Sequence, residues 1–200
     1  MPRTKEAFEA IRETTRQRIE AAALSLFSRK GISVTIGEIA QTAGLSKGLL
    51  YSHYISKDAL IATLVRKATV SSSQKIIGIS QNDSTAATKI RQITSMMCEM
   101  VSELPIGIEY FMFMIQVRMS GFQVPEGDGS VQVLPDPIES LASIIEQGQA
   151  QGSVVKGDAM QLSTVYWATI QGLCCYALTG IPVTADLQIV NRILLKEEVC

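Results

Sequence analysis

Apolar residues recur at helical spacing through most of this sequence. Near the N-terminus a single buried helix face follows the spacing i, i+3, i+4, i+7 and i+8, formed by Ile19, Ala22, Ala23, Leu26 and Phe27. After residue 56 the pattern predicts helices at about 57–80, 84–103, 105–121, 136–151, 158–179 and 184–198. A stretch rich in Gly, Pro and acids, Gly121–Pro137, predicts a loop. Strand signals are weak, so the pattern favours an all-α fold.

Two short helices joined by a tight turn are predicted between residues 36 and 54. Thr35 can cap the first, over about 36–43, and Glu38 three residues later completes a capping box. Gly44 ends that helix, because glycine adopts the left-handed conformation at little cost. Ser46 can cap the second, which would run to about residue 54. Such a pair is typical of a helix-turn-helix, which places its second helix in the DNA major groove, although ordinary packed helices also contain such turns.

The second helix of this pair has an inner and an outer face. Leu50 and Tyr54 are four residues apart and are expected to face inward. The residues left for the outer surface are Ser46, Lys47, Gly48, Leu49, Tyr51, Ser52 and His53. Their hydroxyl, ammonium and imidazole groups suit phosphates and base edges. Ser56 can cap the next helix, and Lys57 in its first turn opposes the helix dipole, which is understandable if Lys57 meets a phosphate.

Three motifs extend over residues 19–60. They are I-x-x-A-A-x-x-L-F-x-x-x-G at Ile19–Gly31, T-I-x-E-I-A-x-x-A-G-L-S-K-G at Thr35–Gly48 and L-Y-x-H-Y-x-S-K-x-x-L at Leu50–Leu60. Together they make the segment 16–64 resemble the N-terminal domain of the tetracycline-repressor (TetR) family. The remainder matches only in length and helical organisation. The resemblance implies a three-helix DNA-binding domain at 1–57, followed by a six-helix ligand-binding and dimerisation domain at 58–200.

The resemblance also implies roles for individual residues. Thr35 would touch phosphate from the start of the first helix, and Lys57 would hold the DNA backbone. The recognition helix would open with Ser46, Lys47, Gly48 and Leu49. Tyr51 and His53 would reach phosphates or base edges.

Two positions depart from the family's pattern. Gly37 stands where relatives often carry a longer polar or charged residue, so a groove contact would be missing and the helix would be less stable. Leu49 stands where many carry Thr or Ser, and it could either meet a thymine methyl group or simply pack.

Charge and hydropathy agree with DNA contact at one end of a protein with a large apolar interior. Up to Asp58 there are nine basic residues against six acids, and in the remainder nine against thirteen. A basic segment beside an acidic segment fits this arrangement. The 46% hydrophobic content and mean hydropathy of +0.21 suggest a large core and a buried subunit interface. The N-terminus lacks the apolar segment of a signal peptide, and no long uncharged apolar run is present, so we expect a cytoplasmic protein.

The residues that carry most enzyme chemistry are scarce. The one histidine, His53, lies on the predicted recognition helix. The cysteines form no C-x-x-C pair, and they are Cys98, Cys174, Cys175 and Cys200. We interpret them as small buried residues, with a redox switch across a dimer interface as the alternative. Neither an enzyme, a cofactor nor a metal site is expected.

The helix predicted at 158–179 is apolar on most sides, which indicates burial against both its own subunit and a partner. Together with the helix at 184–198, it would form an intersubunit four-helix bundle. TetR relatives dimerise in this region. A dimer would also place two recognition helices about one DNA turn apart, on a palindrome.

The central helices are rich in methionine and aromatic residues, which predicts either an adaptable apolar pocket or ordinary core. The candidate lining residues are Met97, Met100, Phe111, Met114, Trp167 and Gln171. We therefore expect a homodimeric, ligand-responsive transcriptional regulator, a repressor, which binds a palindromic operator and is released by a small, largely apolar effector. The alternative is a helical ligand- or protein-binding dimer that has lost DNA binding.

Overall fold

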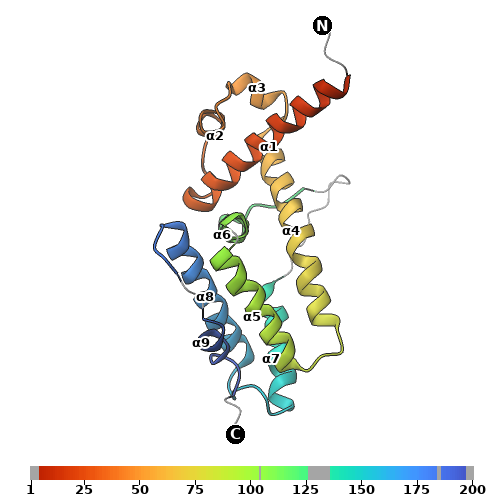
Figure 1. Ribbon diagram of the computed structural model, residues 1–200, viewed down its shortest axis with the longest axis vertical. Coiled ribbons are helices and arrows are strands. Elements are labelled where there is room, and N and C mark those ends of the chain that lie inside the picture. Colours follow the sequence, from red (N-terminus) through yellow and green to blue (C-terminus); the bar gives the residue numbers. More distant parts are fainter. Residues whose placement is uncertain (1–4, 104, 126–135, 184–185, 197–200) are drawn as a thin grey trace. The chain divides into compact units, whose positions relative to one another are not determined.

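The computed structural model describes residues 5–103, 105–125, 136–183 and 186–196, and the all-α prediction is confirmed (Figure 1). The helices are, in chain order, α1 (Lys5–Lys30), α2 (Ile36–Thr42), α3 (Lys47–Tyr51), α4 (Lys57–Gln81), α5 (Ala86–Glu103), α6 (Pro105–Ser120), α7 (Pro137–Ala150), α8 (Ala159–Leu178) and α9 (Leu187–Asn191). One isolated antiparallel bridge joins Val154 to Leu195.

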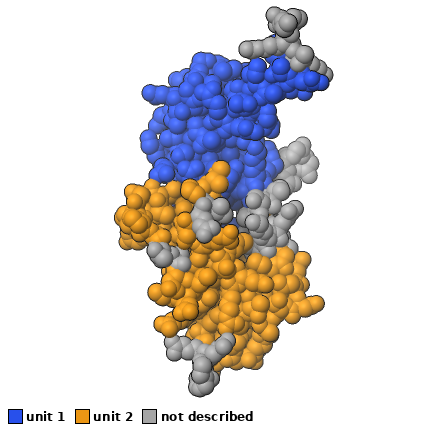
Figure 2. Space-filling view, viewed as in Figure 1, with its two compact units in different colours: residues 1–68, 109–132 blue, residues 69–108, 133–200 orange. Residues whose placement is uncertain are grey.

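The first compact unit comprises residues 1–68 and 109–132 (blue in Figure 2). Its core is built on α1, whose Ile19, Ala23 and Phe27 are fully buried at the predicted helical spacing. Phe27 stacks on Phe113 of α6, with ring centroids 5.8 Å apart. Buried side chains from α2, α3 and α4 complete this core: Ile39, Leu50, Leu60 and Leu64. Burial of these apolar faces is what fixes α2 and α3 in place.

The second compact unit comprises residues 69–108 and 133–200 (orange in Figure 2). Within it α5 packs against α7, α8 and α9, and α7 packs against α8. Its core residues include Ile90, Ile93, Ile145, Tyr166 and Ile170. Buried polar groups of α5 and α8 are paired, since the Tyr166 and Thr94 hydroxyls lie 3.1 Å apart and Trp167 Nε1 donates to the Pro137 carbonyl at 2.9 Å.

The predicted helices after residue 56 are confirmed to within two residues at each end, with the exception of the last. The helix predicted at 184–198 is wrong: α9 covers only Leu187–Asn191, and the chain then turns. Two backbone bonds explain the difference, because Val155 N–H donates to Leu194 O at 2.8 Å and Lys196 N–H donates to Ser153 O at 3.2 Å. Tertiary pairing has replaced the helical bonds.

Three further expectations have different outcomes in the structure. Most of the predicted loop at Gly121–Pro137 lies outside the described residues. Cys98 and Cys174 are buried as expected, whereas Cys175 is exposed, and Cys200 lies outside the described residues. The functional division into 1–57 and 58–200 stays a prediction, while the first compact unit continues to residue 68 because the start of α4 contributes to its core.

Among the described helices, none taken alone is both long and apolar enough to cross a membrane; α5 and α6 satisfy length and composition only as a bent pair.

Candidate nucleic-acid interface

The start of α2 is fixed by the predicted capping box. Thr35 Oγ1 accepts from the Glu38 N–H at 3.3 Å, and the Thr35 N–H donates to Glu38 Oε2 at 2.9 Å. The Thr35 hydroxyl also donates to this carboxylate, at 2.8 Å. The bond from the Thr35 N–H, followed by that from its hydroxyl, lowers the pKa of Glu38, because both favour the charged form. The hydroxyl proton of Thr35 is thus engaged within α2.

The turn between α2 and α3 is held by a side chain of α1. Gly44 has a φ of +65°, as its predicted role at the end of α2 requires. Arg18 Nη2 donates to the carbonyl of Ala43 at 2.7 Å. This carbonyl lies at the C-terminal end of α2, where a cation is favoured by the helix dipole. Sequence patterns gave no signal for Arg18, since its partner is 25 residues away.

α3 presents most of its side chains to the surface. Ser46 caps it as predicted, accepting from the Leu49 N–H at 3.2 Å. It ends at Tyr51 rather than near residue 54. At this end the Ser52 hydroxyl donates to the carbonyl of Leu49, three residues earlier, at 2.7 Å. Leu50 is fully buried, whereas Leu49 and Tyr51 are 42% and 52% exposed.

The exposed residues of this region form what we call the α3 face: Ser46, Lys47, Gly48, Leu49, Tyr51 and Ser52. Thr35 at the start of α2 is exposed as well, and Lys47 reaches toward it over Gly37. The structure therefore brings together seven of the nine residues predicted to contact DNA. The other two, His53 and Lys57, are half-buried.

Lys57 already has partners within the protein. Its ammonium donates to the carbonyls of Ile32 at 2.8 Å and Val34 at 3.3 Å, in the segment that leads into α2. This gives a structural reason for a cation in the first turn of α4, where the sequence suggested only a phosphate. Contact of Lys57 with DNA stays a prediction.

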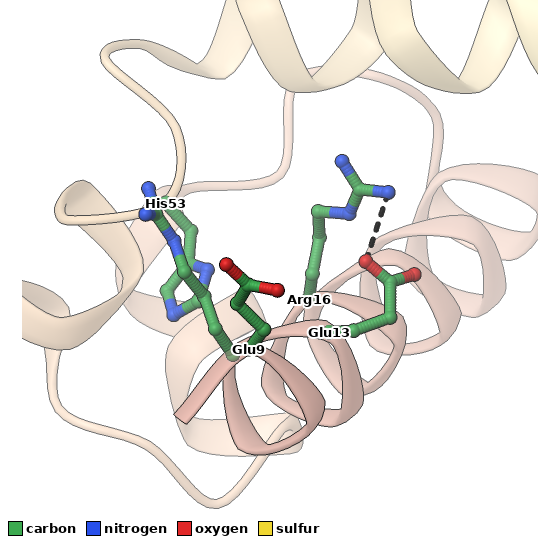
Figure 3. Close-up of a pocket in the computed structure, with 5 residues that line it drawn as sticks. Glu9, Glu13, Arg16 and His53 are labelled. Atoms are coloured by element: carbon green, nitrogen blue, oxygen red, sulfur yellow. Dashed lines mark ion pairs between the residues drawn. The ribbon is translucent and has the colours of Figure 1, made fainter. Parts of the chain in front are cut away.

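His53 lies in a groove lined by the N-terminal half of α1. The groove has a volume of about 390 Å³, and its lining residues are Glu9, Arg12, Glu13, Arg16 and His53 (Figure 3). Arg16 Nη2 pairs with Glu13 Oε2 at 3.0 Å, so some of the charge is neutralised. Burial, and then Arg12 and Arg16, lower the pKa of His53, because each of them disfavours the charged imidazole.

A buried carboxylate joins three segments of the first unit. Glu20 of α1 is only 6% exposed, and it accepts from the Tyr54 hydroxyl at 2.6 Å and from the Lys67 ammonium of α4. Burial, followed by the bond to Glu20, raises the pKa of Tyr54. Sequence reasoning placed Tyr54 inside but missed the other two, because their positions on the chain carry no periodic signal. This Glu20 cluster ties the end of the helix-turn-helix to α4.

Comparisons with known proteins identify the N-terminal region. Residues 19–64 match the family model described as bacterial regulatory proteins, tetR family. The chain is 43% identical over 53 residues to the HTH-type transcriptional regulator AcrR of Shigella flexneri, a span of 26% of this chain and 25% of that protein. Residues 19–64 are therefore a TetR-type N-terminal segment. The matched region contains α2, α3 and the whole α3 face, with the buried Leu50 and Tyr54 beneath it.

A second relative extends the match further along the chain. The uncharacterized HTH-type transcriptional regulator YvaF of Bacillus subtilis (strain 168) is 33% identical over 94 residues, 46% of each chain. The chain thus spans between a quarter and about half of the length of these curated relatives.

Solved structures share the fold of this chain over nearly its whole length. A gamma-butyrolactone receptor (ArpA-like protein) superposes with a TM-score of 0.65 at 22% identity, covering 92% of this chain and 90% of that one. The ketosteroid transcriptional regulator KstR2 of Mycobacterium tuberculosis superposes with a TM-score of 0.65 at 16% identity, covering 91% and 95%. At these identities the likeness establishes the fold.

The residues predicted to line an effector pocket are spread over α5, α6 and α8. Met97 and Trp167 are buried, and the indole N–H of Trp167 is bonded to the Pro137 carbonyl. The partly exposed candidates are Met100, Phe111, Met114 and Gln171. None of the six lines the groove of Figure 3. Their role in binding a ligand stays a prediction.

Proposed function

We propose that this protein is a cytoplasmic, homodimeric repressor of the TetR family that binds a palindromic operator and is released by a small, largely apolar effector. The observation that carries the proposal is the α3 face. Six residues between Ser46 and Ser52 are exposed while Leu50 between them is fully buried, so a short capped helix offers its polar side to solvent. This is the arrangement with which a recognition helix enters a major groove.

The groups on the α3 face suit DNA by their chemistry. Lys47 and the hydroxyls of Ser46 and Tyr51 can bind phosphate oxygens, and Gly48 allows the DNA backbone to come close. Leu49 is not packed in the core, so its apolar side chain is available to a thymine methyl group.

Dimerisation is supported by an exposed apolar surface in the second unit. On α8, Val165 and Tyr176 are more than half exposed, and on α9 Ile189 is more exposed still. Because α9 is short, we assign most of the dimer interface to the exposed apolar side chains of α8. A dimer is also what recognition needs, since two helices about 34–36 Å apart read two half-sites of a palindrome.

Effector control is supported by composition and by likeness. The central helices are rich in methionine and aromatic side chains, which adapt to apolar ligands. Two proteins of the same fold are named as a gamma-butyrolactone receptor and a ketosteroid transcriptional regulator. A coupling of about 1–3 kcal/mol between effector and DNA is a large fraction of the roughly 4–10 kcal/mol that separates specific from non-specific binding, so it suffices to empty an operator.

The test is DNA affinity of a Tyr51→Ala variant compared with Met119→Ala. Both remove an exposed apolar side chain, but Met119 lies on α6, outside the α3 face. We expect Tyr51→Ala to weaken operator binding while the dimer stays intact, and Met119→Ala to bind as the wild type does. If the operator affinity of Tyr51→Ala were unchanged, the α3 face would not be the DNA-binding surface. A folded dimer that shows no DNA binding at all would favour the alternative, a ligand-binding protein.

A further inference from the structure

The side chain of Lys47 crosses from α3 to α2 and lies over Gly37. A Cβ atom built on Gly37 would be 2.7 Å from Lys47 Cε and 3.1 Å from Lys47 Nζ. Contacts below 3.0 Å with a Cβ essentially do not occur, so this position of Lys47 requires that residue 37 has no side chain. A longer residue at 37, which the family resemblance would have favoured, would compete with Lys47 for the same space.

The ammonium of Lys47 is free to bind an anion at this place. Lys47 is exposed and forms no hydrogen bond or ion pair with any described residue. Thr35 Oγ1 lies 3.7 Å from the same point over Gly37, but its proton is donated to Glu38. Lys47 is therefore the group that can supply positive charge to a phosphate above the start of α2.

We propose that Gly37 is a positioning residue for DNA binding: it leaves open the space through which Lys47 of the recognition helix delivers the phosphate contact over α2. The absence of a side chain at position 37 therefore does not remove the phosphate contact, because Lys47 of α3 makes that contact. The inference rests on the proposed DNA-binding function and adds to it the role of one residue that does not itself touch DNA.

A double-mutant cycle tests the inference. The proteins are the wild type, Gly37→Ala, Lys47→Ala and the double variant, and the probe is a 40-base-pair duplex carrying the palindrome that the wild type enriches from random-sequence DNA. Affinity is measured over a series of salt concentrations, and thermal stability is measured for each protein. Gly78→Ala is the matched control, because Gly78 is an exposed helical glycine of α4 with no atom within 4 Å of its Cβ position.

Gly37→Ala should fold at least as well as the wild type, since alanine favours a helix and the displaced group is the end of a flexible side chain. It should nevertheless bind DNA more weakly, with the salt slope reduced by about 0.9 for each protomer. For two protomers this amounts to a loss of about 30-fold at 0.15 M salt. Lys47→Ala should show the same loss, and the double variant should be no weaker than Lys47→Ala alone.

Two results would overturn the inference, and a third would contradict the proposed function on which it rests. Wild-type affinity and salt slope in Gly37→Ala would show that the position of Lys47 over Gly37 is irrelevant to DNA. Losses that add in the double variant would show that residue 37 acts independently of Lys47. Failure of the wild-type protein to enrich any palindrome would instead contradict the proposed function. This outcome would be known before the double-mutant cycle, because the enrichment experiment comes first.

Discussion

Gly48 gives the sharpest test of the α3 face, because replacing it by alanine should change stability and DNA affinity in opposite directions. Gly48 is exposed in the first turn of α3, and a Cβ atom built on it has no other atom within 4 Å. Its backbone is not in the left-handed region, so alanine fits without strain. The added methyl group meets only whatever binds the surface of α3.

The two effects have different sizes. Alanine in place of a helical glycine gains at most about 1 kcal/mol, which raises Tm by about 2–4 °C in a chain of this size. Where DNA lies in close contact with α3, the same methyl group would be overpacked, which reduces the free energy of binding by about 1–3 kcal/mol. That cost corresponds to about 5- to 140-fold in Kd for each half-site.

Both effects can be measured on one preparation. Tm is followed by far-ultraviolet circular dichroism, and Kd by fluorescence anisotropy of a labelled operator at fixed salt. Gly78→Ala serves as the control that should gain stability and keep its affinity. A Gly48→Ala protein that is more stable and binds the operator as tightly as the wild type would refute the close approach of DNA to α3.

Three other predictions concern stability and assembly. Glu20→Gln should lower the free energy of unfolding by about 1.5–3 kcal/mol, because it weakens charge-assisted bonds in a buried site; an unchanged urea midpoint would contradict this. Val165→Arg should convert the dimer to a monomer in analytical ultracentrifugation, since it places a charge on the exposed apolar surface of α8; a persisting dimer would exclude this stretch of α8. Burial raises the pKa of Tyr166 to about 12, so the folded state holds a proton that the unfolded chain releases near pH 10; the contribution of this group to stability should be level below about pH 10 and be lost between pH 10 and 12, so the loss of stability over that range should be smaller in Tyr166→Phe.

Features of the helix-turn-helix that depend on neighbouring residues could be predicted from the sequence. The caps at Thr35 and Ser46 and the left-handed Gly44 are each determined within a few residues, and the structure confirms all three. The buried positions of Leu50 and Tyr54 follow from helical spacing and are confirmed as well. Such local signals are reliable because the interacting groups are fixed by the same turn of the chain.

Features that depend on distant segments could not be predicted. The bonds of Arg18 to Ala43 and of Glu20 to Lys67 span 25 and 47 residues, and no spacing rule connects them. The C-terminal segment fails for the same reason, because its apolar residues fit a helix as well as the bridge that pairs Leu195 with Val154. From the sequence we expected Lys57 to bind a phosphate, whereas in the structure its ammonium donates to two carbonyl groups of the segment before α2.

Selection of genomic DNA fragments by the purified wild-type protein, at low and at near-physiological salt, tests the central claim most directly. We expect enrichment of a palindrome whose half-sites lie about one helical turn apart, with affinity that falls steeply as salt rises, because released counterions return to the DNA. A folded dimer that enriches no sequence at either salt concentration would contradict the assignment of the α3 face as a DNA reader.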